Sequence, residues 1–193
     1  EKLNCRNVLQ DDLDVWRHVY HKGHFTGVFQ FTNAGARKFC LQAKPVSIED
    51  LAAITAIYRP GPLKANVHRK YVKAKKDASS IVYDHPIIEK VLGPTSGFVV
   101  FQEQFMTLAS ELAGFSPGES DKLRKTLVKK SLDTADGKMN EREVAKQKFI
   151  NGAEELHNVN REISTRLWET IEAFAAYGFN KSHSVAYAID SYY

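Results

Sequence analysis

The sequence predicts a mostly α-helical protein with minor strand content. Apolar residues recur at helical spacing along almost the whole chain, and Gly, Pro and capping residues separate the periodic segments. The chain has 193 residues, 43% of them hydrophobic and 26% charged, which is typical of a globular protein with a sizeable core. No apolar run approaches the roughly 18 residues of a membrane-spanning helix. We therefore expect an irregular multi-helix domain and no membrane span.

The periodicity defines the expected helices. In chain order they cover residues 11–19, 33–43, 48–58, 99–114, 117–131, 141–156, 161–176 and a last segment that begins at Ser182 or Ser184 and runs to the end. Asp12 places negative charge in the first turn of the first helix, where the helix dipole favours it. Thr32 is the expected cap of the second helix. Ser47, with Asp50 three residues later, predicts a capping box for the third.

The segments between the first helices carry breakers or charge. Residues 28–31, Val-Phe-Gln-Phe, predict a short strand or a buried turn. The string Arg59-Pro60-Gly61-Pro62 must end the third helix, because two prolines and a glycine cannot continue it. A lysine-rich segment over residues 64–76 follows, and then an extended linker through residues 83–86.

Clear end signals mark the helices of the second half. Gly114 stops the fourth helix. The string Ser116-Pro117-Gly118-Glu119 is a complete N-terminal signature, with Ser as the cap, Pro at the first helical position and Glu at the third. Asn140 and Asn160 open the next two helices, and Gly178 separates the last two.

The charge is distributed unevenly along the chain. The net charge is +4, but Lys and Arg exceed the acids in residues 59–90 and 121–150, whereas the acids prevail in residues 91–120 and 151–193. Two basic blocks predict a positive face, for which polyanions are natural partners. Solvated helix faces are the alternative explanation of each block.

Three local strings combine groups that could bind a phosphorylated ligand. A rigid turn holds Arg59 at a helix C-terminus, and Arg124-Lys125 with Lys129-Lys130 place cations on one helix face. The segment 177–184 opens a helix whose N–H groups, with Lys181 beside them, suit an anion, while its aromatic and polar groups suit a base and a sugar. The alternatives are, in turn, a cation that complements the helix dipole, a solvated face and an ordinary turn.

Metal binding is not expected in this chain. Helix geometry or missing ligands argue against a site at residues 12–14, 18–24 or 133–137. Cys5 and Cys40 are too few for a disulfide framework or a four-thiolate zinc site, which fits a reducing cytosol.

Several motifs follow one another in a fixed order from about Phe25 onward. They are residues 27–31, 56–63, 83–86, 101–106, 112–116, 121–125 with Lys129-Lys130, and 177–187. In this order they resemble the bacterial C-family replicative DNA polymerases, the family of the DNA polymerase III alpha subunits. The resemblance implies the fingers domain, which follows the palm and closes on the incoming deoxynucleotide. Residues 1–26 would be the tail of the palm-to-fingers connection, and residues 27–193 the fingers domain, truncated at its C-terminal end.

The resemblance also implies a function for the longer protein. It would be a DNA-directed DNA polymerase whose palm aspartates hold two Mg²⁺ ions for nucleotidyl transfer. No segment here matches those aspartates, so the fragment alone is expected to be inactive. The implied partners are a dNTP, primer–template DNA and other replisome subunits, in the cytoplasm of a bacterium or of a phage-infected host. Because the sequence lacks an initiator Met, we expect it to be a piece of a longer chain.

The resemblance implies these site residues. Contacts to the phosphates are expected from Arg59, Arg124, Lys125, Lys129 and Lys130, with Lys181, Ser182 and His183 near the nucleotide. Tyr177 and Asn180 are expected at the nascent base pair, and no residue is expected to bind metal or to be catalytic. Lys75 lies in a lysine run that is unlike the family pattern, and we expect its removal mainly to weaken the affinity for DNA.

The chain also departs from the family pattern. Thr32-Asn33-Ala34-Gly35 lacks a usual arginine, Leu127-Val128 replaces Met-Gly, Ser96 replaces an aromatic residue, and the lysine run 70–76 is unusual. These departures fit a remote or phage-encoded member. The alternative function is a non-catalytic helical module, a nucleic-acid-binding or adaptor protein that kept the fold and lost the chemistry.

Overall fold

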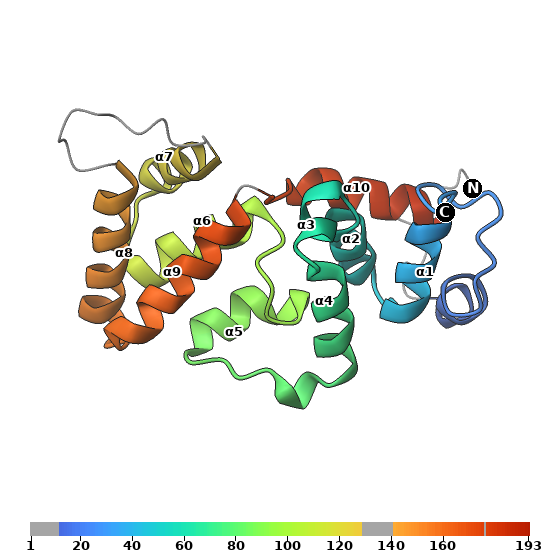
Figure 1. Cartoon of the computed structure of the whole chain (residues 1–193), viewed down its shortest axis with the longest axis horizontal. Helices are drawn as coiled ribbons and strands as arrows, with labels where there is room; N and C mark the ends of the chain where they lie inside the picture. The colour runs from blue at the N-terminus through green and yellow to red at the C-terminus, as the bar shows by residue number, and fades with distance from the viewer. Residues whose placement is uncertain (1–11, 129–140, 176) are drawn as a thin grey trace, which may run out of the picture. The chain divides into compact units, whose positions relative to one another are not determined.

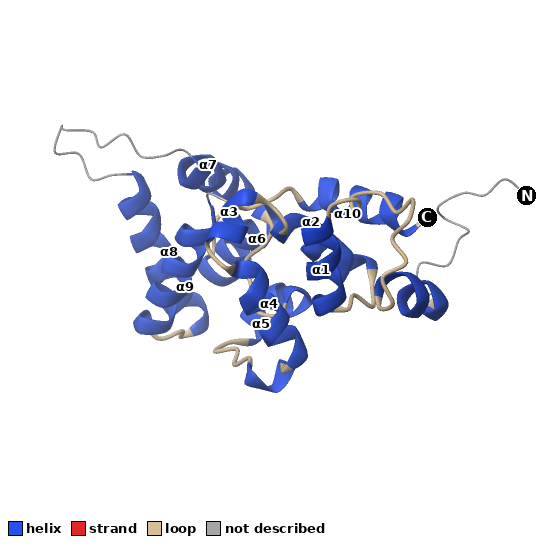
Figure 2. Ribbon diagram, turned by 45° about the vertical axis from the view of Figure 1, so that its right-hand side comes forward, coloured by secondary structure: helices blue, strands red, loops and turns tan. Residues whose placement is uncertain are grey.

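The chain is built from α-helices (Figures 1 and 2). This computed structural model describes residues 12–128, 141–175 and 177–193. Within these ranges there is no β-sheet, and Phe101 and Phe179 form one isolated parallel bridge, so the mostly α prediction is confirmed. No helix in the described ranges is long and apolar enough to cross a membrane. The chain divides into two compact units, the first comprising Glu1–Ala78 with Lys181–Tyr193 and the second Ser79–Asn180.

The first unit is organised around one buried helix. Its elements are the short π-type helix η1 (Val15–Tyr20), α1 (Ala34–Ala43), α2 (Ile48–Ile57), α3 (Pro60–Lys64), α4 (Val67–Lys76) and α10 (Lys181–Tyr192). Helix α2 is apolar on nearly every side, and such a helix must be buried. It packs against α1, α4 and, most extensively, α10. The helix that ends the chain is therefore part of the same core as the helices that begin it.

Aromatic rings pack η1 against the end of α10 in the first unit. Trp16 and Tyr20 are buried, and their rings lie 5.2 Å apart. The Tyr20 hydroxyl donates to the Ser191 carbonyl at 2.7 Å, and Tyr192 packs 5.0 Å from Trp16. These contacts attach the last turn of α10 to η1.

Several boundaries in the first unit differ from the prediction. Helix α1 is capped by Asn33, which accepts from the Gly35 N–H at 2.8 Å, and not by Thr32. Both residues are good caps, and local chemistry does not choose between neighbours. Residues 28–31 form a turn, not a strand. Helix α10 begins at Lys181, before Ser182 and Ser184.

The proline-rich string does two things at once. It ends α2 at Ile57, as predicted, but Pro60 then opens the short helix α3. Proline suits the first helical turn because the N–H that it lacks would be unsatisfied there. The lysine-rich segment that follows contains α4, whose Val67 and Tyr71 are buried.

The second unit surrounds α6 (Gln102–Ala113). After the 3₁₀ turn η2 (Ala78–Ser80) come α5 (Pro86–Leu92), the 3₁₀ turn η3 (Gly93–Thr95), α6, α7 (Pro117–Val128), α8 (Glu141–His157) and α9 (Arg161–Ala175). Phe105, Leu108 and Leu112 on α6 are fully buried, and each such side chain contributes about 1.5–3 kcal/mol by leaving water. Helix α6 packs against α5, α7, α8 and α9.

The predicted caps of this unit form, with one correction. Ser116 and Glu119 make the capping box of α7, in which the Glu119 carboxylate accepts from the Ser116 N–H at 2.9 Å. Asn160 accepts from the Glu162 N–H at 2.7 Å at the start of α9. Helix α6, however, begins at Gln102 and not at Val99, because residues 99–101 are extended. Asn140 lies outside the described residues.

Candidate functional site

The segment before α10 is paired with the start of α6. The Phe179 N–H donates to the Val100 carbonyl at 3.0 Å, and the Gln102 N–H donates to the Phe179 carbonyl at 2.9 Å. The side chain of Gln102 adds a bond from Nε2 to the Gly178 carbonyl at 3.1 Å. Two motifs far apart in the sequence, residues 101–106 and 177–187, are thus joined through Gly178 and Phe179 inside the second unit.

Gly178 lies where the two paired segments approach each other closely. A Cβ atom there would meet Gln102 Cγ at 3.2 Å and Phe105 Cε1 at 3.4 Å. The first contact is tight and needs the Gln102 side chain to shift by a few tenths of an ångström, whereas the second is close to an ordinary van der Waals contact with a fully buried ring. The absence of a side chain at Gly178 therefore allows the segment before α10 to lie close to the start of α6.

A buried glutamine fixes the strand-like stretch that carries this pairing. Gln104 Oε1 accepts from the N–H groups of Val100 and Phe101 at 2.8 and 2.9 Å. Its Nε2 donates to Thr95 Oγ1 at 2.7 Å and to the Val91 carbonyl at 3.1 Å. A buried polar group with all its bonds made holds its surroundings in one arrangement. Sequence reasoning gave Gln104 no role, although a Gln three residues into a helix is a known capping signal.

Tyr177 and Asn180 both face solvent at this place. The Tyr177 side chain is 40% exposed, and Asn180 Nδ2 donates to Glu103 Oε1 at 2.9 Å. The structure therefore gives the Asn180 amide a partner from α6, a role that sequence reasoning did not anticipate. Their contact with a nascent base pair stays a prediction.

The first turn of α10 presents three polar side chains. Lys181, Ser182 and His183 are all exposed. Ser184 is fully buried, and its hydroxyl donates to the Ala52 carbonyl of α2 at 2.6 Å. Only the first serine of the predicted Ser-x-Ser pair is therefore in a position to meet a ligand, because the second anchors the helix.

Arg59 is half-buried just after α2. Its Nε donates to the Ala56 carbonyl at 2.8 Å, so it does complement the carbonyl end of that helix. Burial lowers the pKa of its guanidinium. Arg59 lies in the first unit, as do Lys181, Ser182 and His183.

Arg124 and Lys125 share a carboxylate on α7. Arg124 donates through Nε and Nη2 to Asp121 Oδ1 at 3.0 and 2.9 Å, and Lys125 Nζ lies 2.7 Å from Asp121 Oδ2. Hydrogen bonds from Lys125 and then Arg124 lower the pKa of the Asp121 carboxyl. Sequence reasoning quoted Asp121 in a motif but missed that it orients both cations. Lys129 and Lys130 lie outside the described residues.

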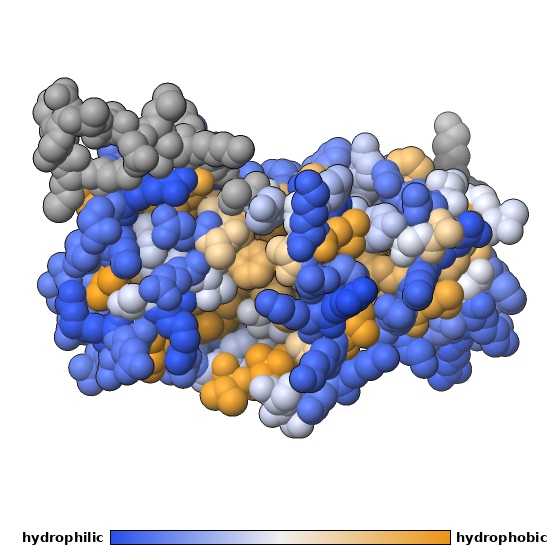
Figure 3. Space-filling view, in the orientation of Figure 1, coloured by the Kyte–Doolittle hydropathy of each residue, from blue (hydrophilic) through white to orange (hydrophobic). Residues whose placement is uncertain are grey.

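Helix α4 carries cations of two kinds. Arg69, Lys70, Lys73 and Lys76 are exposed, and hydrophilic side chains gather over α4 on the face drawn in Figure 3. Lys75 is different, because its ammonium pairs with Asp50 of α2 and only 18% of its side chain is exposed. The ion pair with Asp50 and the low exposure of the side chain argue against the expected contact of Lys75 with DNA, which stays an untested prediction.

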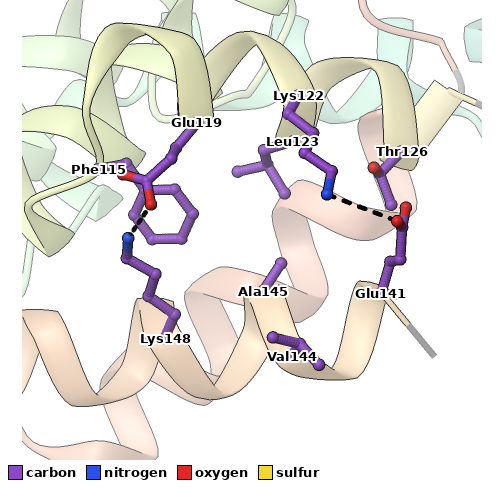
Figure 4. A pocket seen from close by; sticks show the side chains of 9 residues that line it. All are labelled: Phe115, Glu119, Lys122, Leu123, Thr126, Glu141, Val144, Ala145 and Lys148. Atoms are coloured by element: carbon purple, nitrogen blue, oxygen red, sulfur yellow. Dashed lines mark hydrogen bonds and ion pairs between the residues drawn. The ribbon is translucent and has the colours of Figure 1, made fainter. Parts of the chain in front are cut away.

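A pocket of about 200 Å³ lies between α7 and α8 (Figure 4). Lys148 pairs with Glu119 at one end, and Lys122 Nζ lies 3.5 Å from Glu141 at the other. Leu123 is among the side chains that line it. Among the described residues, none of those expected to contact phosphate lines this pocket. Lys122 lines it and Arg124 does not, although both belong to α7.

Among the described residues, no group of three or more His, Cys, Asp or Glu side chains could hold a metal ion. Asp12 and Asp14 are instead part of a local turn, in which the Asp12 carboxylate accepts from the Asp14 N–H at 2.8 Å.

Comparison with known proteins identifies similar sequences along the whole chain. Residues 1–157 match the family described as the bacterial DNA polymerase III alpha subunit finger domain. The DNA polymerase III subunit alpha of Aquifex aeolicus is 43% identical over 191 residues, which is 99% of this chain and 16% of that protein. The subunit of Borreliella burgdorferi is 39% identical over 98% of this chain, and that of Pseudomonas aeruginosa is 34% identical over 100% of it. The chain spans about 16% of the length of these relatives.

Proposed function

Because the chain belongs to the family of bacterial DNA polymerase III alpha subunit finger domains, we propose that it binds the triphosphate of an incoming dNTP and nearby DNA in a template-dependent DNA polymerase. The observation that carries this proposal is the first turn of α10. Lys181, Ser182 and His183 are exposed there, while Ser184 behind them is bonded to α2. The turn is a polar surface on a rigid support.

The chemistry of this turn suits a polyphosphate. The N–H groups at a helix N-terminus point toward an anion, and the helix dipole favours negative charge at that end. Lys181 adds a full positive charge, and Ser182 a hydroxyl that can donate to a phosphate oxygen. Arg59, in the same unit, is proposed as a further phosphate contact through its guanidinium.

Helix α7 contributes a second set of proposed phosphate contacts. Asp121 holds the Arg124 guanidinium in a fixed orientation. A planar fork of this kind can bind two phosphate oxygens at once, which a lysine cannot do. Fixed positive charge stabilises the negative charge that develops on the leaving pyrophosphate. We propose three further phosphate contacts from the same part of the chain, namely Lys125, Lys129 and Lys130.

The proposal assigns the metal ions to another part of the polymerase. The described residues offer no cluster of carboxylates for Mg²⁺, so they do not fit the two-metal site of nucleotidyl transfer. When bound by the palm of the longer protein, Mg²⁺ would supply the activation of the attacking oxygen and the neutralisation of the leaving group. We assign the present residues only to binding and orientation.

The proposed binding partners also include DNA and other proteins. The exposed cations of α4 are suited to the phosphates of primer–template DNA, with affinity that falls as salt rises. Other replisome subunits and the bacterial or phage-infected host cytoplasm belong to the same proposal. So does the division into residues 1–26 as a connection from the palm and residues 27–193 as the fingers.

Primer extension tests the proposal. The longer protein that carries this chain should extend a primer with Mg²⁺ and all four dNTPs, and the purified chain alone should not. Extension by the chain alone would contradict the assignment to binding. A longer protein that binds DNA but never extends a primer would favour the alternative of a non-catalytic module.

A further inference from the structure

Three aromatic rings form a continuous row on the first unit. The rings of Phe29 and Tyr187 lie 5.2 Å apart at 50°, and those of Tyr187 and His183 lie 4.2 Å apart at 47°. Tyr187 and His183 are four residues apart on α10 and so share one face of the helix. His183 is exposed, Tyr187 is half-buried and Phe29 is 43% exposed.

The backbone of a strained turn places Phe29 outside the core. Its neighbours Phe25 and Phe31 are buried and stack on each other at 5.3 Å, so the turn sends two rings inward and one outward. Gly27 and Gln30 both adopt left-handed backbone angles, with φ of 80° and 68°. For a non-glycine residue such as Gln30 this conformation is unfavourable, and strain of this kind gathers at functional sites.

We propose that Phe29, Tyr187 and His183 form a stacking platform for unpaired bases of single-stranded DNA. This inference rests on the proposed function, because it extends the same α10 surface from phosphates to bases. A row of ring faces accepts any base, since every base has a flat π-face. Lys181 is the first residue of the same helix, and its charge is complementary to the phosphates of a strand that passes the helix N-terminus.

The length of the row favours a strand over a single nucleotide. Neighbouring rings of the row are tilted by 50° and 47° to each other, so one flat base can stack on only one of them. Successive bases of a strand, joined by the backbone that Lys181 attracts, can use the whole row at once. A free dNTP would engage one ring face only and gain correspondingly less.

Binding of the purified chain to three probes tests the platform. The probes are an oligothymidylate, a single strand of equal length in which most positions are abasic, and dTTP. Phe29→Leu removes the ring but keeps an apolar side chain, and Phe29→Trp enlarges the ring. Val46→Ala is the control, because Val46 is an exposed apolar residue of the same unit. Thermal melting of each variant checks that the fold is kept.

If the platform stacks bases, the Phe29→Leu variant should lose affinity only for a strand that carries bases. Phe29→Leu should weaken binding to oligothymidylate about tenfold, and Phe29→Trp should keep or strengthen it. Neither variant should change binding to the abasic strand, and Val46→Ala should change nothing. An equal loss on both strands, or no loss on oligothymidylate, would overturn the platform. A loss seen only with dTTP would overturn the choice of a strand as its occupant. Binding of the wild type to the abasic strand and to dTTP measures the proposed binding of phosphates, which does not depend on the rings. A failure of the proposed function can therefore be distinguished from a failure of the platform.

Discussion

The ammonium of Lys75 on α4 pairs with the carboxylate of Asp50 on α2 inside the first unit. The two side chains are only 18% and 11% exposed. The other oxygen of Asp50 accepts from the Val46 N–H at 2.9 Å, which holds the carboxylate in place. This pair joins the most basic helix of the unit to its most buried one.

We predict that Lys75→Ala destabilises the protein and leaves DNA binding almost unchanged. Removing one partner of a mostly buried ion pair leaves the other charge without compensation, at a cost of about 3 kcal/mol. Urea unfolding measures the loss. A variant as stable as the wild type would show that the pair contributes nothing to the fold.

Lys73→Ala is the matched control and should behave in the opposite way. Lys73 is exposed on the same helix, so its removal should leave the stability almost unchanged. The slope of log affinity for duplex DNA against log salt concentration should fall by about 0.9 for each phosphate that the variant no longer neutralises. Unchanged DNA affinity in both variants would remove α4 from the proposed DNA surface.

Arg124→Ala in the full polymerase should lower kcat and raise the KM for dNTP. The combined loss should be about 2–4 kcal/mol, as for other fixed donors that stabilise developing charge. Arg124→Lys should restore little, because a lysine lacks the planar fork. Lys122→Ala is the control, since Lys122 lies on α7 but pairs with Glu141 in another place. Equal effects of Arg124→Ala and Lys122→Ala would make Arg124 part of a solvated face.

The contribution of Glu119 to the stability of the protein should be present at neutral pH and be lost in acid. The hydrogen bond from Lys148, and then those from Ser116, lower the pKa of Glu119 from 4.5 to about 2. A carboxylate with a lowered pKa stabilises the fold fully above its unfolded value and loses this effect as protons bind. The difference in Tm between the wild type and Glu119→Gln should therefore be constant above pH 4.5 and shrink toward pH 2. A difference that grows as the pH falls would contradict this account.

Local chemistry was enough to predict the longer helices and most of their ends, but not α3, α4 or α5, which lie in or directly after segments expected to be a helix stop, a lysine-rich segment and an extended linker. Ser47, Ser116 and Asn160 cap helices as their side chains and spacing indicated. The failures were of two kinds. Thr32 and Asn33 are both good caps one residue apart, and Pro60 both ends one helix and starts another. Such choices depend on how the neighbouring chain packs.

The candidate site was less predictable because its partners come from distant segments. The chemical types of Lys181, Ser182 and Arg124 could be read from the sequence. The pairing of Lys75 with Asp50, of Asn180 with Glu103, and the four bonds of Gln104 could not. A cation that looks solvated in a sequence can be neutralised by a residue that only the fold brings near. Asp121 was the exception, since its spacing of three and four residues from Arg124 and Lys125 is itself a signal.

The central claim is that the first turn of α10 binds the triphosphate of the incoming nucleotide. Steady-state kinetics of Lys181→Ala in the full polymerase tests it most directly, with Lys38→Ala as the control because Lys38 is an exposed lysine of α1 in the same unit. The account predicts that Lys181→Ala raises the KM for dNTP about tenfold, as expected when a charged hydrogen bond is removed, and weakens the affinity for primer–template DNA by clearly less than that. An unchanged KM for dNTP, or an equal change in both variants, would contradict it.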